Sequence, residues 1–175
     1  EALLGVTIPE RQGEYLRFCK LIGDRAVTEF NYRVAGEKAH IFVGLALNGG
    51  DAERGQILKL LRGGGYEVVD LTEDEVAKQH VRYMVGGRPQ RELRESVFAF
   101  EFPEAPGALR DFLVQLGTRW NITLFHYRSY GTDYGRVLVA FENVAGDELF
   151  AQHVQDLGYE CHEVTDSPAY KHFLA

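Results

Sequence analysis

Residues 100–117 read FEFPEAPGALRDFLVQLG, and residues 6–23 read VTIPERQGEYLRFCKLIG. In both stretches a short apolar alternation runs into Pro-Glu, two further residues and a Gly, and then into an apolar stripe of helical period that ends at Gly. Alternation of period 2 predicts a strand, and the longer period predicts a helix. Each stretch is therefore predicted to be a strand, a turn and a helix, and the chain contains this unit twice.

The two halves of the chain match well beyond these stretches. Further segments correspond in the same order, at an offset of 93 to 96 residues: TEFNYR (28–33) with TLFHYR (123–128), IFVGL (41–45) with VLVAF (137–141), and GYEVVDLT (65–72) with GYECHEVT (158–165). A match sustained in order indicates two copies of one module. We expect a first module over residues 1–72 and a second over residues 95–175.

Strand and helix patterns follow each other in the order βαββαβ in both modules. The first is predicted to have strands near 3–8, 26–34, 40–47 and 66–71, and helices near 13–22 and 51–61. The second is predicted to have strands near 96–102, 120–130, 136–142 and 159–164, and helices near 106–116 and 146–156. This order is the split βαβ unit of ferredoxin-like folds. The predicted fold class is α+β, with two ferredoxin-like βαββαβ modules in tandem.

Residues 73–94 are interpreted as an ordered helical connector. Thr72 and Glu75 are spaced as a capping box before a short helix. The Gly-Gly-Arg-Pro run at 86–89 is typical of a turn.

Composition and charge exclude several classes of function. The chain has 175 residues, of which 45% are hydrophobic, so it can bury one or two small cores. Its formal net charge of −7 provides no basic face for nucleic acid or for an anionic membrane. No apolar run approaches the roughly 20 residues of a membrane span, and the first residues, EALLGV, lack the basic start of a signal peptide. We expect a cytoplasmic protein that binds neither nucleic acid nor membrane.

The cysteines and neighbouring histidines predict no special chemistry. Cys19 falls in a predicted helix and Cys161 in a predicted strand, so we expect two buried free thiols rather than a disulfide framework. His153, Cys161 and His162 have irregular spacing and no evident fourth ligand, so no metal site is predicted.

Two other constellations favour structural interpretations. His126 with Ser129 and Asp133 lacks a nucleophile elbow and an oxyanion turn, so a hydrogen-bonded strand histidine is the better interpretation. Strand aromatics could form an RNA-stacking platform on this fold, but the acidic balance and the missing basic RNA-binding signature oppose it. These aromatics are Phe30, Tyr32, Phe125 and Tyr127.

The turn between strand and helix is the candidate binding feature. Pro9 and Pro103 end their predicted strands, and Gly13 and Gly107 stand where the helices begin. Unpaired N–H groups at a helix start carry the positive end of the helix dipole, and a glycine lets a carboxylate approach the backbone closely. The alternative is that Pro and Gly only shape a tight turn. The same strand-to-helix turn occurs in both modules, and this repetition favours an anion site over a turn that only shapes the backbone.

The chain resembles a known family. The paired PE-x-x-G turns, the FNYR and FHYR strands, and the passages HVRYMVGGRP (80–89) and FHYRSYGTDYGRVL (125–138) resemble the carboxy-terminal regulatory region of biosynthetic threonine ammonia-lyase, or threonine deaminase. In that family two ACT-like modules follow a pyridoxal-phosphate catalytic domain and sense branched-chain amino acids. The resemblance covers essentially the whole chain, including HFLA at 172–175.

The resemblance implies a regulatory role rather than catalysis by this chain. The family enzyme is a tetramer that converts threonine to 2-oxobutanoate and ammonia in isoleucine biosynthesis, with inhibition by isoleucine opposed by valine. Such an enzyme needs a Schiff-base lysine and a glycine-rich phosphate cradle, and neither is evident here. The lysines that lie in segments already assigned are Lys20, Lys38, Lys59, Lys78 and Lys171. We expect no catalytic residues and no cofactor in this chain, with pyridoxal phosphate in a separate catalytic domain.

The effectors implied by the resemblance are isoleucine and valine, and the turns and adjacent strands are their predicted site. The predicted residues are Glu10, Gln12, Gly13, Glu14, Tyr15, Phe30, Asn31 and Tyr32 in the first module, and Glu104, Ala105, Gly107, Ala108, Leu109, Phe125, His126 and Tyr127 in the second.

Each part of an amino-acid effector has a predicted partner in these sets. Backbone N–H groups of residues 11–14 and 105–108 are expected to hold its carboxylate. Its ammonium group is expected to contact backbone carbonyls, Asn31 or His126. Its branched side chain is expected to pack against the apolar residues of the set. A module that assembles subunits without binding a ligand remains the alternative function.

Overall fold

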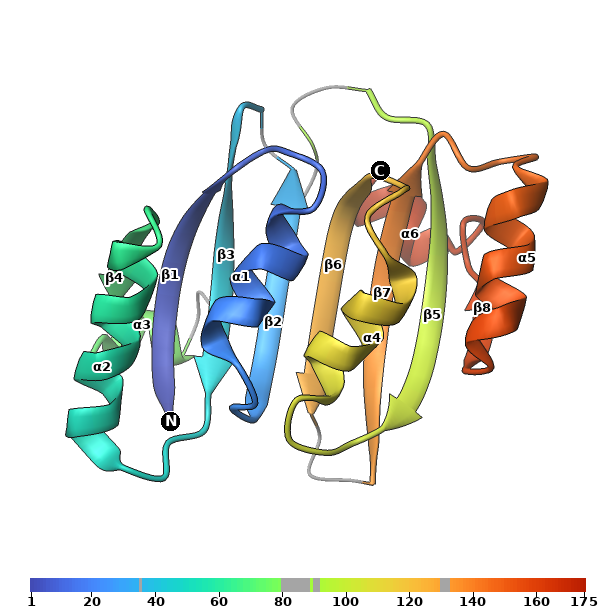
Figure 1. Ribbon diagram of the computed structural model, residues 1–175. Coiled ribbons are helices and arrows are strands. Elements are labelled where there is room, and N and C mark those ends of the chain that lie inside the picture. The colour runs from blue at the N-terminus through green and yellow to red at the C-terminus, as the bar shows by residue number, and fades with distance from the viewer. Residues whose placement is uncertain (35, 80–88, 90–91, 130–132) are drawn as a thin grey trace.

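One antiparallel sheet runs through both halves of the chain in the computed structural model, which describes residues 1–34, 36–79, 89, 92–129 and 133–175 (Figure 1). The first module contains β1 (Ala2–Pro9), α1 (Glu14–Ile22), β2 (Val27–Val34), β3 (Lys38–Leu45), α2 (Gly50–Gly63) and β4 (Glu67–Asp70). The second contains β5 (Glu95–Pro103), α4 (Ala108–Leu116), β6 (Ile122–Ser129), β7 (Tyr134–Glu142), α5 (Glu148–Leu157) and β8 (Glu160–Glu163). Two short helices follow the modules, α3 (Glu75–Gln79) after β4 and α6 (Pro168–Phe173) after β8.

Each module has the βαββαβ order, which confirms the predicted α+β class with two ferredoxin-like modules in tandem. The module boundaries at residues 72 and 95 stay predictions. Most of the predicted connector, including residues 86–88 of its predicted turn, lies outside the described residues.

The two modules join edge to edge at the centre of the sheet. The strand order is β4-β1-β3-β2-β6-β7-β5-β8, so the middle pair is β2 with β6. Asn31 lies opposite His126 in this pair, and these two residues are equivalent in the repeat. Phe30 lies opposite Tyr127 and Tyr32 opposite Phe125, so equivalent residues exchange places across the join. The modules are therefore related by an approximate twofold axis that passes between Asn31 and His126.

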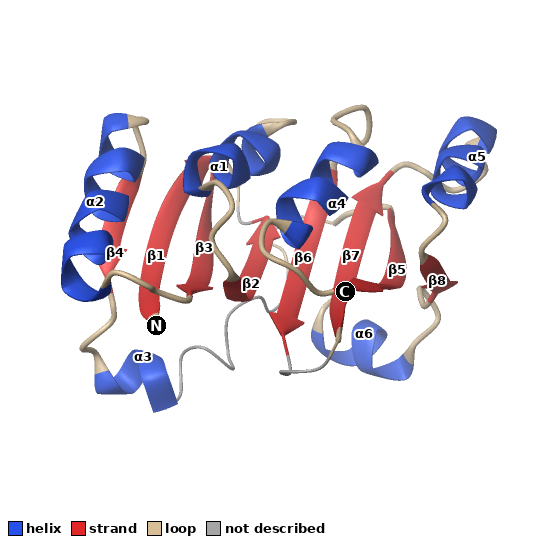
Figure 2. Ribbon diagram, turned by 60° about the horizontal axis from the view of Figure 1, so that its bottom comes forward, coloured by secondary structure: helices blue, strands red, loops and turns tan. Residues whose placement is uncertain are grey.

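The long helices form one layer on one face of the sheet, and α3 and α6 lie on the other face (Figure 2). In α1 and α4 the buried apolar side chains recur at the spacing of a single helical stripe, which turns toward the sheet. These side chains are Tyr15, Phe18, Cys19 and Ile22 in α1, and Leu109, Phe112, Leu113 and Leu116 in α4. The two helices pack beside each other over β2 and β6, so the apolar core is continuous between the modules.

Two smaller clusters cover the opposite face of the sheet. Ala77 of α3 packs with Leu3 and Phe42, and Tyr170 of α6 packs with other buried side chains, among them Leu124. Helix α6 was not predicted. Its start nevertheless carries two sequence signals, the capping hydroxyl of Ser167, which accepts a hydrogen bond from the Tyr170 N–H, and a proline in its first turn.

The predicted capping box before α3 is wrong. The side chain of Asp74, not of Thr72, accepts a hydrogen bond from the Ala77 N–H, at 2.9 Å. The Thr72 hydroxyl accepts instead from the N–H of Leu3 in β1, at 3.1 Å. Thr72 therefore binds the segment after β4 to the sheet, and Asp74 is the residue that caps the start of α3.

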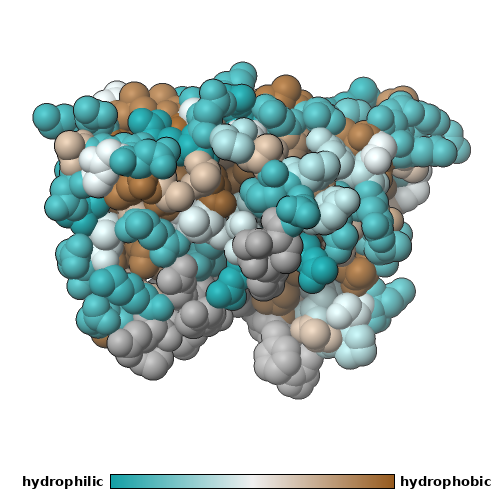
Figure 3. Space-filling view, turned by 90° about the horizontal axis from the view of Figure 1, so that it is seen from below, coloured by the Kyte–Doolittle hydropathy of each residue, from teal (hydrophilic) through white to brown (hydrophobic). Residues whose placement is uncertain are grey.

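Both cysteines are free thiols, with Cys19 buried and Cys161 half-buried. At the end of the molecule seen from below, hydrophobic side chains are scattered among hydrophilic ones (Figure 3). No helix in the described part of the chain is long and apolar enough to span a membrane.

Candidate functional site

The two glycines that precede α1 and α4 have left-handed backbones. Gly13 has φ 87° and Gly107 has φ 77°, a region that strongly favours glycine. Neither helix start has a side-chain cap. Both starts therefore present backbone N–H groups and the positive end of a helix dipole without a capping side chain.

Hydrogen bonds within the turns narrow the predicted set of N–H donors. The Glu14 N–H donates to the Arg11 carbonyl, and the Ala108 N–H donates to the Ala105 carbonyl. The Arg11 N–H donates to the Pro9 carbonyl. The predicted donors that make no hydrogen bond among the described residues are the N–H groups of Gln12, Gly13, Ala105 and Gly107.

Each turn also holds a carboxylate that accepts a hydrogen bond from a tyrosine of the central strand pair. The Tyr32 hydroxyl donates to Glu10 Oε2 at 2.5 Å. The Tyr127 hydroxyl lies 2.5 and 2.6 Å from the two oxygens of Glu104. The tyrosines are buried and the glutamates half-buried. Burial, reinforced by the neighbouring carboxylate, raises the pKa of both tyrosines, so the hydroxyls stay protonated as donors.

A narrow pocket adjoins the first turn at the junction between the modules. We call it the first pocket. From the first module it is lined by residues 8–13, Tyr15, Leu16 and Tyr32, and from the second by Leu113, Gly117, Thr118 and residues 120–122. The Gln12 side-chain amide donates across the junction to the Thr118 carbonyl.

The approximate twofold axis generates a second pocket beside the other turn. From the second module it is lined by Glu104, Ala105, residues 107–110 and Tyr127, and from the first by Cys19, Ile22, Gly23, Arg25 and Val27. Arg110 and Asp24 form an ion pair across the junction. Each pocket therefore combines the helix start of one module with the helix end of the other.

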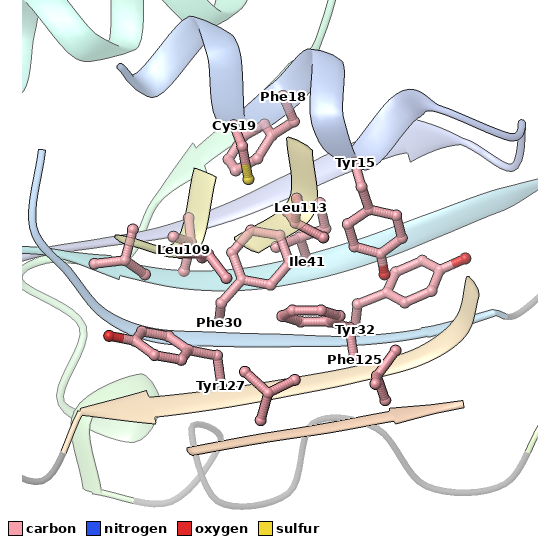
Figure 4. Close-up of a cluster of buried hydrophobic side chains, with 14 of the residues drawn as sticks. Tyr15, Phe18, Cys19, Phe30, Tyr32, Ile41, Leu109, Leu113, Phe125 and Tyr127 are labelled. Atoms are coloured by element: carbon pink, nitrogen blue, oxygen red, sulfur yellow. The ribbon is translucent and has the colours of Figure 1, made fainter. Parts of the chain in front are cut away.

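The pockets differ at the second residue of their helices, Tyr15 in the first and Leu109 in the second. Figure 4 shows Tyr15 beside Tyr32 at one end of the buried cluster and Leu109 near Tyr127 at the other end. The Tyr15 and Tyr32 rings meet edge to face, with centroids 4.4 Å apart. The Tyr15 hydroxyl is buried and has no hydrogen-bond partner within the described ranges. The first pocket thus has a buried polar group where the second is aliphatic.

Three predicted site residues lie beside the pockets without lining them. Phe30 and Phe125 are fully buried between the two pockets, with ring centroids 5.7 Å apart. Glu14 does not line the first pocket, and its carboxylate accepts from the Tyr66 hydroxyl at 3.0 Å and pairs with Arg17 and Arg11. Phe30 and Phe125 therefore belong to the core between the pockets and not to the pocket walls.

Asn31 and His126 lie on the opposite face of the sheet, which corrects their predicted role. Side chains alternate between the faces of a strand, so the neighbours of Tyr32 and Phe125 point away from the helix layer. Asn31 and His126 line a separate hollow with Leu138 and Leu174. They therefore cannot contact a ligand that is held at either turn.

The residues that complete each pocket from the other module were not predicted. Thr118 in the first pocket and Arg25 in the second are examples, and both follow the end of a helix. Their place in a site depends on the pairing of β2 with β6, which no local pattern specifies. Within the described part of the chain, no group of three or more His, Cys, Asp or Glu side chains is placed to hold a metal ion.

Comparisons with known proteins match the chain to one part of a larger enzyme. The family model described as the C-terminal regulatory domain of threonine dehydratase matches residues 1–81 and 86–174. The chain is 60% identical over 176 residues to the L-threonine dehydratase biosynthetic IlvA of Escherichia coli (strain K12). It is 39% identical over 184 residues to the mitochondrial threonine dehydratase of Saccharomyces cerevisiae. These matches cover 100% and 99% of this chain but 34% and 32% of the relatives, so the chain spans about a third of their length.

Proposed function

Because this chain belongs to the family of C-terminal regulatory domains of threonine dehydratase, we propose that it binds isoleucine and valine at the two pockets and controls a catalytic domain. That domain would hold pyridoxal phosphate and convert threonine to 2-oxobutanoate and ammonia in the cytoplasm. Isoleucine would inhibit the enzyme, and valine would oppose this inhibition. The full-length protein would be a homotetramer.

The arrangement of charge in the two pockets supports this proposal. Each pocket combines a helix start, which attracts an anion, with a glutamate carboxylate, which attracts a cation. The other module contributes apolar side chains to each pocket, such as Leu113 in the first pocket and Ile22 in the second. The charged and apolar groups of a zwitterion with a short aliphatic side chain match this combination. The free volumes of about 20 Å³ in the first pocket and about 10 Å³ in the second mean that the junction must widen to admit it.

The position of the pockets at the junction supports a regulatory role. A ligand in either pocket would touch both modules and so favour one relative position of them over others. A typical coupling free energy between an effector site and a distant site is about 1 to 3 kcal/mol. Isoleucine and valine differ by one methylene, which contributes about 0.8 kcal/mol of burial, so opposite effects require different pockets or different states of the protein.

Calorimetric titration of this chain with isoleucine and with valine tests the proposal. Saturating isoleucine should raise the melting temperature because it binds only the folded state, and a phosphate ester should not. A chain that self-associates in solution but shows no heat and no thermal shift with either amino acid would favour the assembly function instead.

A further inference from the structure

We propose that Glu104 and Glu10 bind the ammonium group of the effector, and that the Tyr127 and Tyr32 hydroxyls position their carboxylates. The inference rests on the proposed function, since it assigns a role within pockets that are taken to bind amino acids. The two glutamates take the ammonium-binding role that was predicted from the sequence for Asn31 or His126, which lie on the other face of the sheet.

The glutamate and tyrosine pair is kept in both modules although the surrounding turn differs. The first turn reads PERQG and the second PEAPG, so an exposed arginine in one corresponds to alanine in the other. The next helix residues also differ, as Tyr15 and Leu109 show. The distance from hydroxyl to carboxylate is nevertheless 2.5 Å in both modules. The same contact in two divergent turns points to a requirement that both sites share.

The contacts of Glu104 with the described residues include the Tyr127 hydroxyl but no cation. No lysine, arginine or histidine within the described ranges forms an ion pair with it. Two arginines line its pocket, and both pair elsewhere: Arg110 with Asp24 and Asp111, and Arg25 with Glu53. A carboxylate has about four acceptor positions, so the Tyr127 hydroxyl leaves capacity for an ammonium group.

Space around this pair depends on a glycine in β7. A Cβ atom at Gly135 would lie 2.8 Å from Glu104 Oε2 and 2.9 Å from Tyr127 Cε2, closer than such contacts allow. Strand β7 can therefore approach Glu104 and Tyr127 closely because residue 135 has no side chain. This close approach of β7 keeps the Glu104 carboxylate beside the turn.

The charges fix the orientation of an amino acid in each pocket. Its carboxylate would be repelled by Glu104 or Glu10 and attracted by the N–H groups of Gly107 or Gly13. Its ammonium group would then face the glutamate. In the first pocket the buried Tyr15 hydroxyl offers one more hydrogen bond, which Leu109 cannot offer in the second.

The test compares two probes, isoleucine and 3-methylpentanoate, by calorimetric titration of the whole chain. The second probe has the same carboxylate and branched chain but no ammonium group. We expect the wild-type chain to bind isoleucine much more tightly than 3-methylpentanoate. In the double variant Glu10→Gln with Glu104→Gln we expect isoleucine affinity to fall roughly tenfold or more, because a charged hydrogen bond is lost. Affinity for 3-methylpentanoate should stay the same or rise.

Glu101→Gln is the matched control, since Glu101 lies in β5, the strand that leads into the Glu104 turn, and pairs with Arg136 without lining the pocket. It should leave both affinities unchanged. Wild-type isoleucine affinity in the folded double variant would overturn the inference while leaving the proposed function intact. Equal wild-type affinity for both probes would overturn it independently of any variant's folding. If the wild-type chain bound no isoleucine, the proposed function would fail together with the inference.

Discussion

Arg33 of β2 and Glu95 of β5 form a buried ion pair that links the two modules. The Nη atoms of Arg33 lie 2.5 and 3.0 Å from the Glu95 oxygens, and both side chains are only 2% exposed. The Tyr170 hydroxyl of α6 donates to Glu95 Oε2 at 2.5 Å, and Arg33 Nη2 donates to the Leu174 carbonyl at 2.6 Å. The pair therefore also anchors the C-terminal helix to the sheet.

Removing one partner of this pair should strongly destabilise the fold. Glu95→Ala leaves the Arg33 charge buried without a counter-ion, which typically costs about 3 to 5 kcal/mol. Urea unfolding followed by circular dichroism measures the change in the free energy of unfolding. Lys38→Ala is the control, because its pair with Glu67 is mostly exposed and such pairs contribute about 0 to 1 kcal/mol. Equal losses in the two variants would contradict the structural role given to Glu95.

Tyr66 makes part of the stability dependent on alkaline pH. Burial and then the hydrogen bond to Glu14 raise its pKa from 10.0 to about 12. The folded state thus favours the neutral phenol, so the contribution is complete below pH 10 and is lost as pH rises toward 12. The free energy of unfolding should fall over this interval, and it should fall less in Tyr66→Phe. Parallel curves for the two proteins, measured by urea unfolding at each pH, would show that Tyr66 is not responsible.

The periodicity of the sequence predicted the elements but not how the modules meet. The apolar stripe through Phe18 and Ile22, and its counterpart in the other module, predicted helices and their buried faces because those patterns are local. The pairing of Asn31 with His126 joins strands that lie 95 residues apart, and no neighbouring residue specifies it. Residues that complete a pocket from the other module were therefore beyond prediction.

Some misassignments were avoidable from the sequence. Strand alternation places Asn31 opposite in direction to Phe30 and Tyr32, so all three could not have faced one ligand. The Thr72 hydroxyl matched the spacing of a capping box, but the folded chain uses the Asp74 carboxylate as the helix cap and the Thr72 hydroxyl to bind β1. The contact between Glu10 and Tyr32 could not have been predicted from the sequence, because the two side chains meet only when the turn folds back over the sheet.

The two pockets should bind isoleucine with different affinities. The first pocket is lined by Arg11 where the second is lined by Ala105. It also has the buried Tyr15 where the second has Leu109. Calorimetry should therefore show two classes of site or only one occupied site. Two identical and independent sites would contradict the prediction.

Tyr127→Phe should weaken the isoleucine response while preserving the fold. The ring remains in the core, but the hydroxyl that holds Glu104 is lost. A hydrogen bond to a charged group contributes about 1.5 to 3 kcal/mol. We expect lower isoleucine affinity by calorimetry, with nearly native circular dichroism. Wild-type affinity in the folded variant would indicate that Tyr127 serves only the core.

The last prediction concerns Leu109, which lies in the first turn of α4 and lines the second pocket. Its side chain is 3% exposed and contacts the same buried cluster as Phe112 and Leu113, so it can act in the pocket or in the core. Leu109→Phe adds bulk, and overfilling typically costs about 1 to 3 kcal/mol. If the added ring enters the pocket, the ligand is displaced and isoleucine affinity falls roughly tenfold or more.

The competing result for Leu109→Phe is equally clear. If the position belongs to the core, the free variant should melt at a lower temperature while isoleucine affinity stays nearly unchanged. Calorimetry and thermal unfolding of the same preparation separate these cases. In an intact enzyme, a role in the pocket also predicts full threonine turnover with weakened isoleucine inhibition, because the catalytic domain is untouched and only the coupling to the pocket is lost. Normal inhibition in a stably folded Leu109→Phe enzyme would remove Leu109 from the site.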